Sequence, residues 1–257
     1  MKRLWRCRLA LKLPSLALLI GALIFGGNAV ASEQKTFRFN VSPSGYPPYL
    51  ILENNQPSGI MWDVVARISE RLGYELVAKR VPRKRVDQML LDGFIDGTPR
   101  AIEWTGAPDR FLFTDSVVAI EEVFFIPKTS ELDYRSPRDL FSKTVVTHLG
   151  YNYPLLQSYF EAGNIRRFDV SRDRDMFTFV LHGDRFDAAV ADRLVGQWIL
   201  RKEGLQDQFR TSQISISQFG FRIMLRKDWQ GFGEAFNREL EKMRENGELD
   251  AILANYR

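Results

Sequence analysis

The feature that most constrains the fold of this chain is an alternation of strand-like and helix-like segments. Residues 36–41, 75–79 and 94–98 have strand character, while residues 60–72 and 86–90 carry apolar side chains at helical spacing. Gly73 and Gly93 follow these helical segments, where a helix commonly ends. The resulting β-α-β-α-β order predicts an α/β fold whose mostly parallel sheet is flanked by helices.

The same pattern then begins again. Ser136 and Pro137 form an N-cap and first-turn pair before a short helix. Strands are predicted over 144–148, 167–170 and 187–191, with helices around 154–160, 176–181 and 194–199. Residues 91–96 and 181–187 both run from a helix through a glycine to an Asp and a strand. This echo indicates two lobes built on one plan, followed by a strand over 219–226 and a helix over 232–243.

The first 31 residues have the pattern of a cleavable secretory signal peptide. A basic segment precedes the apolar run 13–25, and Ala29-Val30-Ala31 is a small-residue cleavage signal. Five of the basic residues lie in this segment, so the net charge of +4 minus those five leaves about −1. The basic character therefore belongs to the leader, which argues against nucleic acid as a partner and favours a periplasmic protein.

Chemical motifs of enzymes and metal sites are missing from the sequence. The only cysteine, Cys7, lies in the predicted leader, so no disulfide, thiol nucleophile or thiolate metal site is expected in the mature chain. His148 and His182 are the only histidines, and no motif pairs them. Hydrolase, zinc-protease, phosphate-loop and EF-hand motifs are also absent. We therefore expect no cofactor, no metal and no enzymatic turnover.

Seven short motifs follow one another in a familiar order. They are Tyr46-Pro-Pro-Tyr49, Gly59-Ile-Met-Trp-Asp63, Gly93-Phe-Ile-Asp96, Phe111-Leu-Phe-Thr-Asp115, Leu149-Gly150-Tyr-Asn, Phe186-Asp-Ala-Ala-Val-Ala-Asp192, and Met243-Arg-Glu-Asn-Gly247 with Tyr256. In this order they resemble family 3 of the bacterial extracellular solute-binding proteins. The resemblance covers residues 36–257.

The resemblance implies a two-lobed periplasmic binding protein of type II. The first lobe would hold residues 32–118 and 219–257, and the second would hold 119–218. A small polar, amino-acid-like solute would bind between the lobes at the carboxyl ends of parallel strands. Hinge closure on that solute would then present it to the permease of a membrane ABC importer. We expect the receptor to act as a monomer.

Candidate ligand-binding residues in the first lobe lie on three loops. Tyr46 follows the first strand and offers an aromatic wall. Arg85 belongs to a basic run at a helix start, where cations oppose the helix dipole. The loop after the third strand adds Arg100, Glu103 and Trp104. In the family this loop supplies an arginine for the ligand carboxylate. The matching position here is Ala107, so Arg100 is expected to replace it from earlier in the loop. Arg110, which lies closer to the Phe111-to-Asp115 motif, is the alternative.

Candidate residues in the second lobe are Tyr151, Asn152 and Asp192. The resemblance places Tyr151 and Asn152 on a turn that offers hydroxyl and backbone N–H donors at a helix start. It places Asp192 where amino-acid receptors accept the ligand's ammonium. The alternative for Asp192 is an N-cap for the helix that follows it, and ordinary capping is also open for the Asn152 turn.

Two other functions stay open from the sequence. Periplasmic arogenate or prephenate dehydratases resemble this family, and Glu103 in a desolvated cleft would then be a general acid. A ligand-sensing module that feeds a membrane kinase is the other alternative.

Overall fold

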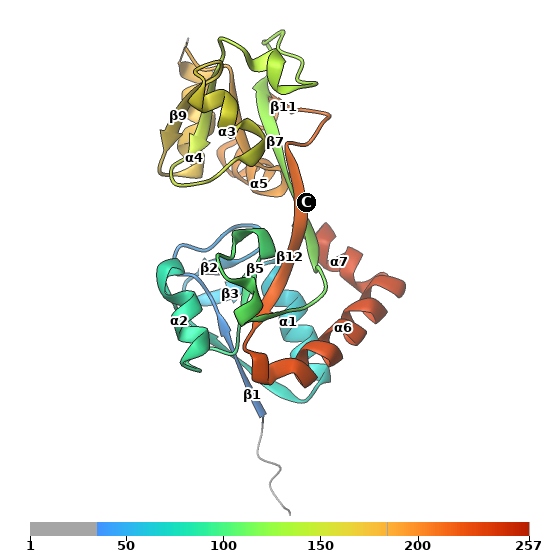
Figure 1. Ribbon diagram of the computed structural model, residues 1–257. Coiled ribbons are helices and arrows are strands. Elements are labelled where there is room, and N and C mark those ends of the chain that lie inside the picture. The colour runs from blue at the N-terminus through green and yellow to red at the C-terminus, as the bar shows by residue number, and fades with distance from the viewer. Residues whose placement is uncertain (1–34, 184, 257) are drawn as a thin grey trace, which may run out of the picture. The chain divides into compact units, whose positions relative to one another are not determined.

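The computed structural model describes residues 35–183 and 185–256, so the predicted signal peptide, residues 1–31, lies outside the described residues. Within these ranges, no helix is long and apolar enough to cross a membrane. The described chain is an α/β structure in which two groups of parallel strands are joined by two long antiparallel strands. We call these groups the first lobe and the second lobe (Figure 1).

The main sheet runs through both lobes in the order β4-β1-β5-β12-β7-β10-β8-β9. In the first lobe, β1 pairs in parallel with β4 and β5, and in the second lobe β8 pairs in parallel with β9 and β10. The predicted parallel sheet is thus confirmed within each lobe. These strands are β1 (Lys35–Asn40), β4 (Tyr74–Lys79), β5 (Gly97–Arg100), β8 (Thr144–His148), β9 (Arg166–Val170) and β10 (Ala188–Asp192).

Helices from both ends of the described chain cover the first lobe. The apolar face of α1 (Ile60–Arg71) packs with α6 (Gln230–Glu245) and α7 (Glu248–Ala254) in one buried cluster. Phe37 and Phe39 of β1 belong to the same cluster and are fully buried. The smaller helix α2 (Val86–Leu91) buries Val86 and Leu90 in a neighbouring cluster. The first lobe is therefore complete only when the last helices are in place.

Helices α3 (Pro154–Glu161), α4 (Asp173–His182) and α5 (Arg193–Glu203) belong to the second lobe. Met176, Phe177 and Val180 of α4 pack with Val123 and Phe125 in its core. In a second buried cluster, Leu156 of α3 packs with Phe124 and Val145 of the sheet strands. The predicted short helix after Ser136 is a single 3-10 turn, Pro137–Leu140, with a complete capping box.

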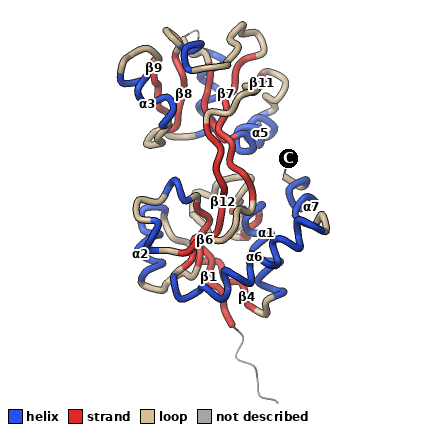
Figure 2. Tube along the Cα trace, turned by 45° about the vertical axis from the view of Figure 1, so that its right-hand side comes forward, coloured by secondary structure: helices blue, strands red, loops and turns tan. Residues whose placement is uncertain are grey.

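Two long strands connect the lobes. Strand β7 (Val118–Pro127) pairs with β10 and β11 (Phe209–Thr211) near its end, and with β12 (Ser217–Leu225) near its start. The other end of β12 pairs with β5 and with the short β6 (Leu112–Phe113). Figure 2 shows β7 and β12 side by side between the two groups of elements. Both predicted lobe boundaries, 118 and 219, fall inside these continuous strands and stay a prediction.

One predicted strand begins later than its sequence pattern indicated. Residues 94–98 were expected to form a strand, but β5 begins at Gly97. The reason lies in the preceding turn, where the N–H of Phe94 donates to the carbonyl of Met89 at 2.9 Å. A small hairpin of β2 (Ile51–Glu53) and β3 (Gln56–Ser58) completes the fold.

Candidate functional site

A cavity of about 510 Å³ lies at the carboxyl ends of strands from both lobes. In the first lobe its lining includes Asn40 at the end of β1 and Arg100 at the end of β5. In the second lobe it includes His148 at the end of β8 and Ser171 just after β9. Doubly wound sheets place their ligand sites at this edge. The volume is in the range of small-molecule sites, roughly 300–1,000 Å³.

Arg100 gives the first-lobe wall a buried cation. The residue is only 9% exposed, and its Nη2 donates to Asp87 at 2.5 Å. Its buried Nε has no hydrogen-bond partner among the described residues. Burial lowers the pKa of Arg100, whereas the charge of Asp87 acts to raise it. The Nε is enclosed by protein atoms and about 10% of the side chain is exposed, so a group in the cavity meets the positive charge of Arg100 at that exposed part.

Aromatic rings form the apolar part of the same wall. The ring centre of Tyr46 lies 6.2 Å from that of Trp104, and Phe221 lies 5.6 Å from Trp104 in an edge-on arrangement. Burial raises the pKa of Tyr46 well above its ordinary value of 10.0, so its phenol stays neutral. The wall therefore offers flat apolar faces together with one neutral hydroxyl.

Arg83 links the two lobes across the cavity. Its guanidinium carbon lies 5.6 Å from the Trp104 ring centre in the first lobe and 5.5 Å from the Tyr151 ring centre in the second. Its Nη1 also lies 3.4 Å from the Tyr151 hydroxyl. A guanidinium between two aromatic faces is attracted to both. Arg83 is thus a second cation that faces the cavity.

The second-lobe wall holds a carboxylate and an imidazole. Asp173 is the first residue of α4, and its Oδ1 lies 3.8 Å from the Nε2 of His148. The ring of His148 packs on Tyr151 with centres 4.3 Å apart. Burial raises the pKa of Asp173, while His148 and Arg83 act in the opposite direction. This wall therefore provides an acceptor opposite the arginines of the first lobe.

The structure brings together half of the residues that the sequence singled out. The cavity is lined by Tyr46, Arg100, Trp104 and Tyr151. Its lining does not include Arg85, Glu103, Asn152 or Asp192. The first three of these are exposed, and each is the sequence neighbour of a lining residue. Although each one adjoins the lining, the direction of its side chain depends on turn geometry that the sequence does not specify. Their ligand contacts stay predictions.

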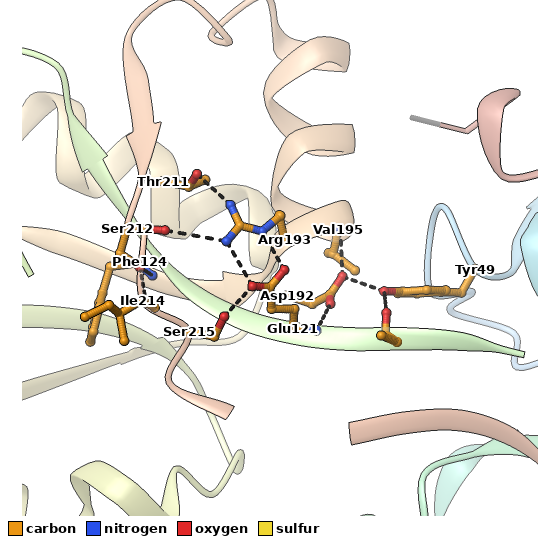
Figure 3. A network of polar contacts seen from close by, with 11 residues as sticks. Tyr49, Glu121, Phe124, Asp192, Arg193, Val195, Thr211, Ser212, Ile214 and Ser215 are labelled. Atoms are coloured by element: carbon orange, nitrogen blue, oxygen red, sulfur yellow. Dashed lines mark hydrogen bonds and ion pairs between the residues drawn. The ribbon is translucent and has the colours of Figure 1, made fainter. Parts of the chain in front are cut away.

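Asp192 is held by a network of protein donors. Its Oδ1 accepts hydrogen bonds from the Val195 N–H at 3.0 Å and the Tyr49 hydroxyl at 2.9 Å. Its Oδ2 accepts one from the Glu121 N–H at 3.0 Å (Figure 3). Asp192 is 6% exposed, and burial raises its pKa against the opposing effect of these bonds. The structure shows the N-cap that the sequence offered as the alternative, and the ammonium contact stays a prediction.

Four charged or titratable residues of the cavity were not chosen from the sequence. Arg83 was passed over in favour of Arg85, His148 had no motif partner, and Arg172 and Asp173 were not considered. A signal for the last three was present, because each lies at or just after the carboxyl end of a predicted parallel strand. Among the described residues, no group of three or more histidines, cysteines or acids could hold a metal ion.

Solved structures share this fold. An ancestral arginine-binding protein bound to arginine is 20% identical, covers 86% of this chain and 97% of its own, and has a TM-score of 0.67. A Wolinella succinogenes DSM 1740 protein, assigned as the binding component of an ABC transporter and complexed with lysine, is 16% identical over 87% of this chain and 96% of its own, with a TM-score of 0.71. A histidine kinase sensor domain is 19% identical, covers 87% of this chain and 96% of its own, and has a TM-score of 0.68.

The sequence itself carries the family relationship. No curated protein matches it. The model of the bacterial extracellular solute-binding proteins, family 3, matches residues 39–257. That range begins within β1 and includes the later elements of both lobes, the connecting strands and every residue of the cavity lining. The chain belongs to the bacterial extracellular solute-binding proteins, family 3.

Proposed function

We propose that this chain is a periplasmic receptor for a small, carboxylate-bearing, amino-acid-like solute, which it captures between its two lobes for ABC-type import. The family relationship supports solute binding. The arginine and lysine complexes of two structural neighbours support an amino-acid-like solute. The proposal extends to a monomer that docks on a membrane permease, with lobes of residues 32–118 plus 219–257 and of residues 119–218.

The observation that carries this proposal is the mostly buried positive charge of Arg100 in the cavity lining. The residue is 9% exposed, and Asp87 is its ion-pair partner. A guanidinium binds a carboxylate through charge-assisted hydrogen bonds worth about 1.5–3 kcal/mol. A solute carboxylate would therefore find a preformed partner, while Tyr46, Trp104 and Tyr151 would contact its apolar part.

Lobe closure is the proposed response to binding. The lining comes from both lobes, and β7 and β12 are the strands that connect them. A solute that touches both walls would favour the closed arrangement by its differential affinity for that state. Small-angle scattering should then give a smaller radius of gyration with bound solute. An unchanged profile at saturation would contradict closure.

Export through the predicted leader is part of the proposal. Cleavage after Ala31 would give a mature chain that begins at Ser32. Mass spectrometry of the periplasmic fraction checks this N-terminus, and a full-length chain retained in the cytoplasm would contradict export.

The experiment that tests binding is a thermal-shift screen of amino acids, dicarboxylates, polyamines and small peptides. A ligand at 100 times its Kd raises the free energy of unfolding by about 2.7 kcal/mol, which gives a measurable shift. Stabilisation by amino acids or other carboxylates supports the proposal. Stabilisation by polyamines alone would contradict the anion site.

Substitution of Arg100 locates that site. Arg100→Ala should weaken binding of the best carboxylate from the screen at least about tenfold, because the ligand charge loses a buried partner. The matched control is Arg238→Ala in α6, which removes an exposed cation of the same lobe outside the lining. Arg85→Ala tests the remaining sequence prediction. Equal affinity of Arg100→Ala and the wild type would place the anion elsewhere.

A sensing role is the second candidate, because a histidine kinase sensor domain has the same fold. Co-purification with an ABC permease would favour import, and co-purification with a membrane kinase would favour sensing. The dehydratase alternative predicts product formation from arogenate or prephenate by the purified protein, which chromatography would detect.

A further inference from the structure

A second pocket, of about 730 Å³, lies on the second lobe away from the solute cavity. Its walls are the starts of β8 and β9 and the loop before β10, over residues 142–144, 166–168 and 185–187. The pocket therefore lies at the amino ends of these parallel strands, whereas the solute cavity lies at the carboxyl ends of β8 and β9. A ligand in this pocket would not contact the solute.

Positive charges outnumber negative charges in the second pocket. The cations of its lining are Lys143, Arg166, Arg167 and Arg185. Asp187 is the only acid among the described lining residues, and Lys143 pairs with it at 3.1 Å. Arg167 pairs with Asp169 at 2.9 Å. Arg166 and Arg185 are thus two guanidinium groups without a counter-charge among the described residues.

Arg166 is held in place by uncharged acceptors. Its Nε donates to the Thr144 hydroxyl at 2.9 Å, and its Nη2 donates to the carbonyl of Ser142 at 2.6 Å. These bonds fix the guanidinium without neutralising it. Arg185 of the same lining is exposed and has no hydrogen bond with a described residue. A fixed guanidinium that keeps its charge binds a carboxylate through charge-assisted hydrogen bonds.

Three phenylalanine rings form a partly exposed cluster at this pocket. Phe168 of β9 is 37% exposed and Phe179 of α4 is 40% exposed, and their ring centres lie 5.4 Å apart. Phe186 packs on both, at 4.8 Å from Phe168 and 5.5 Å from Phe179. Phe168 and Phe186 line the pocket, so a ligand there would meet an apolar surface as well as positive charge.

Strand β9 is the last strand of the sheet in the second lobe. Strand β8 pairs with one side of it, and no other described strand pairs with its outer side (Figure 2). The N–H of Leu149 donates to the carbonyl of Val170, which shows that alternate residues 166, 168 and 170 bond to β8. The N–H and C=O groups of Arg167 and Asp169 therefore point outward. Such an edge can pair with an extended peptide.

We propose that β9 and the second pocket bind an extended acidic segment of a partner protein, which adds to the sheet as a further strand. The segment would pair with the outward backbone groups of Arg167 and Asp169. Its acidic side chains would bind Arg166 and Arg185, and an apolar side chain two positions along would pack on Phe168, because alternate residues of a strand share a face. This inference goes beyond solute binding and does not depend on it.

A peptide fits these features better than other anions do. A small anion or a lipid headgroup would use the cations but would leave the edge of β9 unpaired. A second copy of β9 would bring Arg166 and Arg167 against their own counterparts, and like charges across paired strands are destabilising. The charges of the edge therefore oppose self-pairing and select an acidic strand.

Fluorescence anisotropy with labelled peptides tests the inference. The probe has the sequence Glu-Thr-Glu-Thr-Val-Thr-Val, which places the acids and the valines on one face, and the reversed sequence covers the opposite strand direction. At least one of the two peptides should bind saturably, and replacing both acids with lysine should abolish binding. Absence of saturable binding by either acidic peptide would overturn the inference.

N-methylation of the peptide backbone separates strand pairing from simple charge attraction. One peptide carries N-methyl groups on the threonines, and another carries them on the glutamates and valines. Successive N–H groups of a strand point to opposite sides, so only one of these two sets would face β9. One peptide should therefore lose at least about tenfold in affinity while the other keeps it. Equal affinity of both peptides would show that β9 does not pair with them.

Substitutions in the second pocket locate the site. Arg185→Glu should weaken peptide binding at least about tenfold, because it places an acid beside the acids of the peptide. Lys202→Glu is the matched control, since Lys202 is an exposed cation of α5 outside this pocket. Asp169→Pro removes an outward N–H and should bind less tightly than Asp169→Ala, which keeps it. Thermal unfolding checks that each variant is folded, and Arg185→Gln replaces Arg185→Glu if the latter is not.

Other ligands for this pocket would give different results. Pyrophosphate that binds as tightly as the peptide would indicate a small-anion site, and a dimer that Arg185→Glu dissociates in analytical ultracentrifugation would indicate a second copy. Either result would overturn the inference. Solute affinity measured by calorimetry should be equal for Arg185→Glu and the wild type. Failure of the proposed function would therefore appear in calorimetry, whereas failure of this inference would appear in the peptide measurements.

Discussion

In each lobe, an aspartate before a strand is hydrogen-bonded to the backbone of the neighbouring strand, but the charges around the two aspartates differ. In the first lobe, Asp96 precedes β5 and exchanges two hydrogen bonds with the backbone of Arg38, both at 2.8 Å. In the second lobe, Asp187 precedes β10 and does the same with Thr144, at 2.7 and 2.9 Å. Each aspartate thereby fixes the register of two neighbouring parallel strands.

The surroundings of the two carboxylates differ. Asp96 is fully buried, with Arg38 at 2.6 Å and Arg226 at 3.2 Å. The Asp187 side chain is 26% exposed and has Lys143 at 3.1 Å. The two aspartates therefore have the same structural role, but we expect them to contribute differently to the free energy of unfolding. In the first lobe this aspartate belongs to a buried charge cluster, and in the second lobe it belongs to a partly exposed ion pair.

The largest effect should come from Asp96→Asn. The substitution leaves two arginines beside a buried neutral amide, and breaking a buried ion pair costs about 3–5 kcal/mol. Urea unfolding followed by circular dichroism would measure the loss. A loss below about 1 kcal/mol, as for an exposed ion pair, would remove the proposed contrast between the lobes.

A smaller effect is expected from Gly196→Ala in the second lobe. A Cβ at this position of α5 would lie 2.1 Å from the buried ring of Phe125. Overpacking of a core costs about 1–3 kcal/mol. The matched control is Gly231→Ala in α6, where an added Cβ meets no atom within 4 Å. The control should be neutral or slightly more stable in thermal unfolding. Equal stability of both variants would show that the second-lobe core can relax.

Glu121→Gln should have an effect that depends on pH. Arg193 binds Glu121 through two hydrogen bonds, at 2.7 and 3.1 Å, and these bonds lower the pKa of Glu121 below its ordinary 4.5. This stabilisation is complete above pH 4.5 and is lost as the pH falls through the lower pKa of the folded state. The variant should be about 1 kcal/mol less stable at pH 7, with a smaller difference in acid.

The neighbouring Glu122 provides the control for that measurement. Burial raises the pKa of Glu122, although the Ser217 hydroxyl acts to lower it. A raised pKa means that its ionised form costs stability, and this cost grows as the pH rises through the folded-state value. Glu122→Gln should therefore be as stable as the wild type at pH 7, or more so. A loss equal to that of Glu121→Gln would contradict the assigned pKa directions.

The smallest effect is expected from Asp187→Asn. The amide oxygen can still accept the Thr144 N–H, so the substitution removes mainly a partly exposed ion pair with Lys143. Such pairs contribute about 0–1 kcal/mol. Urea unfolding beside Asp96→Asn gives the direct comparison. A loss as large as that of Asp96→Asn would show that the two lobes depend equally on this charge.

Local patterns were sufficient to predict most elements. The 144–148 strand matches β8, and apolar spacing located α1, α4 and α6. The similar segments 91–96 and 181–187 contain the two aspartates, Asp96 and Asp187, that bond to the backbone in the same way. The family resemblance implied two strands that cross between the lobes, but the local pattern did not predict β7. Its ten residues carry two acids within an apolar run, and its partners lie far away in the sequence. Long-range pairing of this kind leaves no local period.

The cavity was predicted less completely than the fold. The cavity lies at the edge of the sheet that the strand-end rule indicates, and four of the eight predicted residues line it. Arg83 and Asp173 were missed because the choice between neighbouring side chains depends on a 3-10 turn and a helix start whose directions only the folded chain defines. Asp192 was chosen for its position at a strand end. The sequence could not decide between a ligand contact and an N-cap, because the donors from Tyr49 and Glu121 come from distant parts of the chain.

The paired strands β7 and β12 have a consequence for the order in which the chain folds. The N–H of Ile216 donates to the carbonyl of Glu122 at 2.7 Å, so the segment between them is a continuous stretch whose ends meet. This stretch contains every strand of the second lobe except part of β7. The first-lobe core instead needs α6 and α7 from the last residues of the chain. During synthesis, which proceeds from the N-terminus, the second lobe can fold first. The first lobe, although it begins the sequence, is the last to be completed.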